Sequence, residues 1–145
     1  MRVILNTNVI LAAFAGRGLA NAVFELCLDK HEIIISEHIV SELQNSLQKK
    51  LKMPKDKVLM ITGYLREFCT LSNYKRLDKE ACRDIDDVKI LGLSEVAKPD
   101  YIITGDKDLL VLKKFHSVPI ITQREFWEIS KGKKIKNLDP WISHP

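Results

Sequence analysis

Short apolar segments alternate with longer segments of helical periodicity along most of the chain. The short segments, rich in β-branched residues and bounded by polar ones, are typical of buried strands. They are Arg2–Leu5, Ile33–Ile35, Tyr101–Thr104 and Val118–Ile121. The longer segments repeat apolar residues at helical spacing and predict helices. They are Val9–Phe14 with Ala20–Leu28 (broken around Gly16 and Gly18), Ile39–Leu51, Lys55–Leu71, Val88–Ala97, Leu109–Leu112 and Arg124–Ser130.

This alternation predicts an α/β fold, in which helices cover both faces of a central, mainly parallel β-sheet. The chain has 145 residues, a length that fits one ordinary domain. No repeat or flexible linker divides it, so we expect one domain at residues 1–131 and a basic and polar tail at 132–145. In such folds ligands bind outside the carboxyl ends of the strands, so the residues that follow each strand are the first candidates for a site.

The composition indicates a folded chain without a membrane segment. Apolar residues make up 46% of the sequence, which is too many for a disordered chain. No apolar run approaches the ~18 residues of a transmembrane helix. The N-terminus lacks the features of a secretory signal, so we expect a cytoplasmic protein. Cys27, Cys69 and Cys82 match no metal or redox spacing and are expected to be core thiols, and the scattered histidines predict no zinc site.

Basic and acidic residues gather in different parts of the sequence. The net charge is +4, and a basic stretch near the C-terminus would attract a phosphate backbone. An ordinary solvated face is the alternative reading of that stretch. The lysines expected to contact nucleic acid are Lys113, Lys114, Lys131, Lys133 and Lys134. A second basic run lies at residues 49–57, while acidic residues concentrate at 78–87 and 106–108, which predicts an acidic pocket beside a polyanion-binding surface.

Oxygen-bearing side chains follow two of the predicted strands. Asn6, Thr7 and Asn8 come directly after the first strand, and Asp106 and Asp108 follow Tyr101–Thr104. Oxygen ligands without histidine or cysteine suit a hard cation, so Mg²⁺ or Mn²⁺ is the expected cofactor. Divalent ions held by carboxylates hydrolyse phosphodiesters by activating a water and neutralising charge on the leaving oxygen. The spacing alone leaves open which of the acids take part.

Several sequence blocks resemble a single family. L-N-T-N-V-I-L at residues 5–11 resembles the opening motif of PIN-domain ribonucleases, and S-E-H-I-V-S-E-L at 36–43 resembles the stretch that carries their second acid. R-D-I-D-D-V-K-I-L at 83–91 and P-D-Y-I-I-T-G-D-K-D-L-L at 99–110 are similar to the toxin-like branch, called VapC-type or PIN_3. P-I-I-T-Q-R-E-F at 119–126 resembles the last strand and helix of that branch. The blocks follow the family order over nearly the whole chain.

The resemblance implies a three-layer α/β/α sandwich with a Mg²⁺-dependent ribonuclease site. It places the catalytic set at Asn6, Glu42, Asp87 and Asp106. It places the metal ligands at Asn6, Asp87, Asp106 and Asp108. The partners that it implies are an RNA substrate, a small cognate antitoxin that covers the site, and a second copy of the chain in a homodimer.

Other polar residues of these blocks are expected to support the site. Thr7 would orient an acid or a water, and Asn8 would bond locally and shape the turn. Thr104 would help the chain to turn tightly at the end of its strand. Asp86 is expected to be a solvating neighbour of Asp87, because the spacing from Asp87 to the next apolar pair follows the family pattern.

One position departs from that pattern, because the family's first acid is Asn6 in this chain. Its carbonyl oxygen can still reach a metal ion, but it carries no charge and cannot act as a base. The loss of one unit charge ~4 Å from the metal is worth at most ~4 kcal/mol per metal charge at an effective dielectric of ~20. The sequence is compatible with a naturally weakened nuclease, with deliberate removal of the acid, and with a structural role for Asn6.

Two functions therefore remain open from the sequence. One is a metal-dependent endoribonuclease of a toxin–antitoxin pair, and the other is a PIN-fold protein that binds RNA or a partner without catalysis. A phosphatase of the haloacid-dehalogenase kind is disfavoured, because Asn6 and Asn8 occupy the positions of its paired aspartates. A dinucleotide-binding domain is disfavoured because no G-x-G-x-x-G follows the first strand.

Overall fold

The computed structural model describes residues 1–16, 18–77 and 85–132. Their centre is a six-stranded sheet with the strand order β3-β2-β1-β4-β6-β5. The strands are β1 (Arg2–Leu5), β2 (Glu32–Ile35), β3 (Thr70–Leu71), β4 (Tyr101–Ile103), β5 (Lys114–Phe115) and β6 (Val118–Ile121). All neighbouring pairs are parallel except β5 with β6, which confirms the mainly parallel sheet predicted from the sequence.

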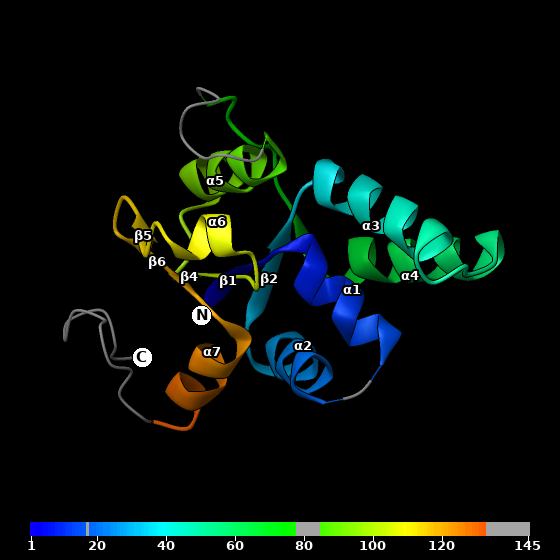
Figure 1. The fold of residues 1–145 in the computed structure, drawn as a ribbon, viewed down its shortest axis with the longest axis horizontal. Helices are drawn as coiled ribbons and strands as arrows, with labels where there is room; N and C mark the ends of the chain where they lie inside the picture. The colour runs from blue at the N-terminus through cyan, green and yellow to red at the C-terminus, as the bar shows by residue number, and fades with distance from the viewer. Residues whose placement is uncertain (17, 78–84, 133–145) are drawn as a thin grey trace.

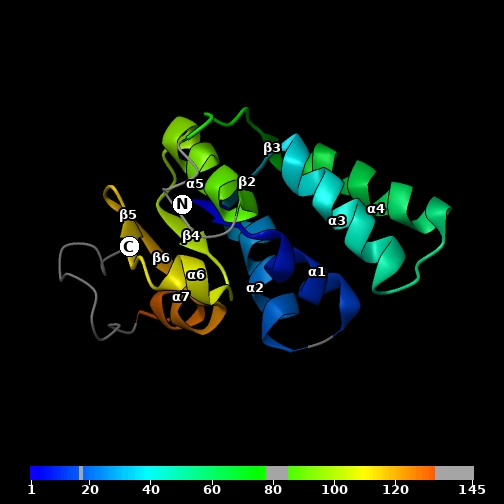
Figure 2. The same cartoon turned by 45° about the horizontal axis from the view of Figure 1, so that its top comes forward.

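Helices cover both faces of this sheet. They are α1 (Thr7–Ala15), α2 (Leu19–Lys30), α3 (Glu37–Lys49), α4 (Lys55–Phe68), α5 (Ile85–Ala97), α6 (Lys107–Leu110) and α7 (Gln123–Ser130). In Figure 1 the sheet lies between α5 above and α2 with α7 below, and α3 and α4 run side by side in both views (Figure 2). The predicted three-layer α/β/α sandwich is confirmed.

The apolar strands are buried because both faces of the sheet are covered. Val3, Ile4 and Leu5 in β1 and Ile34 and Ile35 in β2 are fully buried. Near-continuous apolar runs of this kind are the pattern of a parallel sheet with helices on both faces. A parallel sheet also brings the carboxyl ends of its strands to one edge, where the polar residues that follow them meet.

The carboxyl ends of β1 and β4 lie next to each other at that edge. The backbone N–H of Asn6 donates to the carbonyl of Ile103 at 3.0 Å, and that of Thr104 donates to Ile121 at 3.0 Å, so the sheet ladder continues into the polar residues. β1 is the strand at which the order along the chain reverses, since it pairs with β2 on one side and β4 on the other. Ligands of open α/β sheets bind outside such a reversal point.

The predicted elements need three corrections. The helix predicted at Lys55–Leu71 ends at Phe68, because Thr70–Leu71 pairs with β2 as the short strand β3. The sequence predicts Pro54 in the first turn of this helix, a position that suits proline, but Pro54 precedes the helix at its N-cap position. Lys114–Phe115 forms the edge strand β5, which was not predicted. Two-residue strands are too short to leave a periodic pattern in the sequence.

Two of the predicted core thiols are confirmed. Cys27 and Cys69 are buried and unbridged, and burial raises the pKa of Cys27 to about 12 and that of Cys69 to about 11. Cys82 and most of the predicted tail lie outside the described residues. None of the described helices alone is long and apolar enough to cross a bilayer. Helices α1 and α2 have the necessary length and apolar character only when taken together, and a bend of 109° separates them.

Candidate metal centre

A polar pocket of about 150 Å³ lies at the carboxyl ends of β1 and β4. Its walls come from the first turn of α1, from the side of α3 that faces the sheet, and from the N-terminal ends of α5 and α6. The residues that line it are Asn6, Thr7, Asn8, Leu11, Glu42, Ser46, Lys50, Asp86, Asp87 and Asp106. Four carboxylates from three separate parts of the sequence thus share one small space.

Asn6 begins α1 and is held by hydrogen bonds at both ends of its amide. Its Oδ1 accepts from the backbone N–H of Thr7 at 2.7 Å, and its Nδ2 donates to Thr104 Oγ1 at 2.8 Å. Thr104 Oγ1 also accepts from the backbone N–H of Asp106 at 3.0 Å. Asn6 therefore caps a helix and, through Thr104, links the end of β1 to the loop that carries Asp106.

Glu42 faces the pocket from the second turn of α3. Ser36 caps this helix by accepting from the backbone N–H of Ile39 at 3.2 Å, which starts α3 directly at the end of β2. Thr7 Oγ1 donates to Glu42 Oε1 at 3.0 Å, the kind of contact expected for an acid-orienting threonine. Burial is the main cause that raises the pKa of Glu42, and the neighbouring charge of Asp86 also raises it. Glu42 consequently holds a proton more readily than an exposed glutamate.

His38 joins Glu42 to the start of α5. Its Nε2 lies 3.1 Å from Asp86 Oδ1 and 3.3 Å from Glu42 Oε1. Its Nδ1 lies 3.4 Å from the ammonium nitrogen of Lys89, which can only donate. The ring proton is therefore on Nε2 when His38 is neutral, and it points at the two carboxylates. Sequence analysis missed His38, because a histidine one turn before an acid on a helix becomes informative only once its partner from α5 is placed.

Asp87, Asp106 and Asp108 form a separate group of three acidic side chains. Oxygen atoms of these three carboxylates lie within 4.8 Å of one another. Asp87 is buried in the first turn of α5, where the positive end of the helix dipole stabilises its charge. Asp106 caps α6, with its Oδ1 accepting from the backbone N–H of Asp108 at 2.8 Å. Such hard oxygen donors are the ligands that Mg²⁺ and Mn²⁺ prefer, so these residues fit a divalent ion.

The chain also resembles known proteins. Its sequence matches the PIN-domain family (PIN_3) over residues 2–108. The chain belongs to the PIN-domain family. The fold of this PIN domain is similar to that of a chain in the crystal structure of VapBC2 from Rickettsia felis bound to a DNA fragment from their promoter, with a TM-score of 0.61 and 15% sequence identity. The match covers 84% of this chain and 98% of that chain. None of the curated sequences compared with the PIN domain matches it significantly.

The pocket of the PIN domain contains most of the site residues expected from the sequence. Asp108 does not line it, although its carboxylate joins the group of Asp87 and Asp106. Asp86, expected to be a solvating neighbour, lines the pocket and contacts His38. Asn8 lies exposed in the first turn of α1, and among the described residues its side chain makes no hydrogen bond, so the expected local bond is not formed.

The lysines expected to contact nucleic acid lie away from this pocket. Lys113 and Lys114 are at the edge strand β5, and the Lys131 ammonium lies 4.7 Å from the centre of the Trp127 ring at the end of α7. Lys133 and Lys134 lie outside the described residues. Lys50, from the second basic run at residues 49–57, lines the pocket, and Lys89, which lies outside both basic stretches, approaches it through His38.

Replacing Glu42 with glutamine should stabilise the metal-free PIN domain at neutral pH. Because the folded-state pKa of Glu42 is raised, the ionised carboxylate destabilises the fold, and this cost grows as the pH rises through that pKa. We expect Glu42→Gln to raise the Tm at pH 7 in a chelator by ~2–4 °C, the shift that about 1 kcal/mol produces in a chain near this size. The difference should shrink toward pH 4.

The exposed Glu37 on the same helix is a matched control for this comparison. Its hydrogen bond with Arg66 lowers the pKa of Glu37, so Glu37→Gln should not raise the Tm at pH 7. Thermal unfolding of the three proteins at both pH values measures the effect. A Glu42→Gln protein that is less stable than the parent at pH 7 would show that its hydrogen bonds outweigh the cost of burial.

Proposed function

We propose that this PIN domain is a Mg²⁺- or Mn²⁺-dependent endoribonuclease, acting in the cytoplasm as the toxin of a toxin–antitoxin pair. The observation that carries the proposal is the group formed by Asp87, Asp106 and Asp108, whose carboxylate oxygens all lie within reach of one ion. Glu42 lies in the same pocket as Asp87 and Asp106, at the edge of the sheet where ligands of α/β folds bind. Membership of the PIN-domain family and the likeness in fold to the VapBC2 structure add support.

In the proposed hydrolysis of a phosphodiester, some residues of the pocket would bind the metal ion and another would act as the base. Asp87 and Asp106 would hold the ion, with Asp108 beside them. When bound, a divalent ion there would supply a more acidic water and would neutralise charge on the leaving oxygen. Glu42, which contacts Thr7 and His38, would orient a water and accept its proton at a carboxylate oxygen. The raised pKa of Glu42 brings its proton affinity closer to that of a base working near neutral pH.

The uncharged side chain of Asn6 would limit the affinity of this site for a divalent ion. Its amide oxygen already accepts from the Thr7 backbone and its amide nitrogen points at Thr104, so it contributes position and no charge. A divalent ion is therefore less well neutralised than it would be with an acid at residue 6. We propose that the chain binds its metal weakly and cleaves RNA slowly.

A PIN-fold protein that binds RNA or a partner without catalysis is the second candidate function. The double hydrogen bonding of Asn6 favours it, because this amide has a complete structural role without a metal. A labelled single-stranded RNA incubated with the purified chain and Mn²⁺ separates the two functions. Cleavage that stops on addition of a chelator supports the nuclease, and bound but intact RNA supports the binder.

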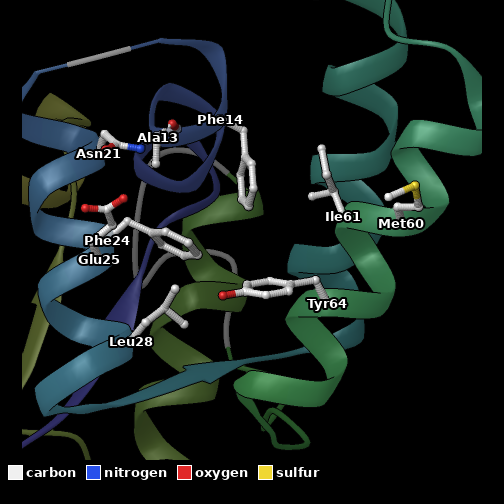
Figure 3. Close-up of a pocket in the computed structure, with 9 residues that line it drawn as sticks. All are labelled: Ala13, Phe14, Asn21, Phe24, Glu25, Leu28, Met60, Ile61 and Tyr64. Carbon is white, nitrogen blue, oxygen red and sulfur yellow. Dashed lines mark hydrogen bonds between the residues drawn. The ribbon is translucent and has the colours of Figure 1, made fainter.

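The antitoxin is the proposed protein partner, and we propose that it binds in an apolar groove. A cavity of about 370 Å³ lies between the α1–α2 pair and α4. Figure 3 shows Phe14, Phe24 and Leu28 on one side of it, facing Met60 and Tyr64 on the other. Met60 is 72% exposed and Tyr64 is 40% exposed, which is unusual for large apolar side chains grouped in one place.

Helix α1 connects this apolar groove to the acidic pocket. Its residues Thr7 and Leu11 line the pocket, and Ala13 and Phe14 line the groove. A partner segment with apolar side chains in the groove can therefore extend along α1 and cover the pocket. One continuous segment of an antitoxin could thus occupy the groove and block access to the pocket.

Met60→Glu should break the complex between the PIN domain and its antitoxin. An unpaired carboxylate buried against the partner costs several kcal/mol, so we expect binding to weaken ~100-fold or more. The matched control is Val111→Glu, because Val111 is 73% exposed and lies outside the groove. Co-purification with the candidate antitoxin shows whether the complex forms, and a binding titration of the purified proteins measures the loss of affinity. Equal binding by both variants would place the antitoxin elsewhere.

A further inference from the structure

A second groove, lined by cations, lies near the acidic pocket at the start of α5. Its volume is about 390 Å³, and Tyr74, Lys75, Arg76, Ile85 and Lys89 contribute to its walls. We call it the basic groove. It lies next to the acidic pocket along α5, because Ile85 lines the groove and the following residue, Asp86, lines the pocket.

The backbone of the segment that carries these cations is fixed against α5. The N–H of Lys75 donates to the carbonyl of Gly92 at 3.0 Å. A Cβ atom at residue 92 would overlap the carbonyl oxygen of Lys75, so only glycine allows this close approach. The position of Lys75 and Arg76 beside the pocket is therefore set by the backbone of a core helix.

The charges of the basic groove are not neutralised by the described residues. Lys75 and Arg76 are exposed, and no described carboxylate lies within ion-pair distance of either. Lys89 turns toward His38, which contacts the pocket carboxylates Glu42 and Asp86. A polyanion approaching the acidic pocket is repelled by its carboxylates, and cations beside the pocket offset that repulsion.

The aromatic ring of Tyr74 lines the basic groove near His38, the residue that contacts the pocket carboxylates. Its centre lies 6.3 Å from that of the His38 ring, and Tyr74 is 37% exposed. An exposed aromatic ring next to unpaired cations is the combination with which proteins hold single-stranded nucleic acid, because bases stack on the ring while cations contact phosphates. An acidic protein segment would need the cations but not the ring.

We propose that the basic groove binds the RNA strand beside the scissile phosphodiester, with Lys75 and Arg76 on phosphates and Tyr74 under a base. This inference rests on the proposed nuclease function, because it assigns the path of that substrate. The groove is also separate from the apolar groove assigned to the antitoxin, which is formed by α1, α2 and α4.

The test measures binding of a fluorescent single-stranded RNA by anisotropy over a range of salt concentrations, using the full chain with Asp106→Asn to prevent cleavage. In this background, Lys75→Ala with Arg76→Ala should weaken binding at low salt by at least ~10-fold and flatten the slope of log affinity against log salt by about 1.4, or about 0.7 per lost phosphate contact. Tyr74→Ala should weaken it about 5-fold or more, and Tyr74→Phe should leave it unchanged.

Lys55→Ala with Lys57→Ala is the matched control, since it removes the same charge from exposed positions at the start of α4. It should change the affinity less than ~2-fold, and all variants should unfold at similar temperatures. An equal loss in both double variants, or none in either, overturns the inference while RNA binding itself stands. Unchanged RNA binding with lost antitoxin binding would assign the groove to a protein. A parent chain that binds no RNA at any salt concentration would overturn the proposed function together with the inference.

Discussion

Asp106→Asn should abolish metal-dependent RNA cleavage, with a loss of at least about 10²–10³-fold in rate. The substitution removes one charge from the group formed with Asp87 and Asp108, whose oxygen atoms lie within 4.8 Å of one another. Asparagine keeps the oxygen that accepts from the Asp108 backbone, so the cap of α6 is retained. The fold should therefore survive while the metal is lost.

Asp29→Asn is the control for this substitution, because it removes an exposed carboxylate whose neighbour is Lys30 at the far end of α2. Initial rates on a labelled RNA, measured from 0.1 to 10 mM Mn²⁺ as an approximate range, compare the two variants with the parent. A cleavage rate for Asp106→Asn that matches the Asp29→Asn rate would remove Asp106 from the catalytic set.

Asn6→Asp should raise the cleavage rate at least ~10-fold and lower the metal concentration that half-saturates the enzyme. A carboxylate at this position adds one charge beside the divalent ion and keeps the oxygen that accepts from the Thr7 backbone. Its second oxygen replaces the amide donor to Thr104, so the Thr104 hydroxyl must turn and donate in its place. If the toxin proposal is correct, this variant should also be harder to express without the antitoxin.

Asn6→Ser tests whether the gain comes from charge, because serine also caps a helix but adds no carboxylate. It should not exceed the parent in cleavage rate or in metal affinity. If neither the parent nor Asn6→Asp cleaves RNA in Mn²⁺, while Glu42→Gln and Asp87→Asn leave the Mn²⁺ affinity unchanged, the catalytic proposal fails. The function as an RNA- or partner-binding protein would then stand.

Much of the fold could be predicted because strand burial leaves a clear pattern in the sequence. The segments that form β1, β2, β4 and β6 are apolar on both faces. Because parallel strands end at the same edge of a sheet, the sequence alone predicts that Asn6 and Asp106 lie at one edge. The short strands β3 and β5 could not be predicted, because their pairing depends on neighbours that are distant in sequence.

The candidate site was only partly predictable for a related reason. The acids Glu42 and Asp87 were identified through the family resemblance, and periodicity alone would have left them as ordinary helix residues. The cluster around His38 needs α3 and α5 to be packed together, since it joins an acid on each helix. Lys75 and Arg76 could not be predicted as nucleic-acid contacts, because two adjacent basic residues are a weaker signal than the lysine-rich stretch near the C-terminus.

The claim that a divalent metal occupies this pocket can be tested most directly by anomalous diffraction from a crystal soaked in Mn²⁺. We expect an anomalous peak among Asp87, Asp106 and Asp108, with Glu42 and Asn6 on the same side of it. The peak should be stronger in Asn6→Asp and missing in Asp106→Asn at the same Mn²⁺ concentration. A pocket without a peak in the parent and in Asn6→Asp, while Mn²⁺ is bound elsewhere in the crystal, would contradict the proposed metal centre.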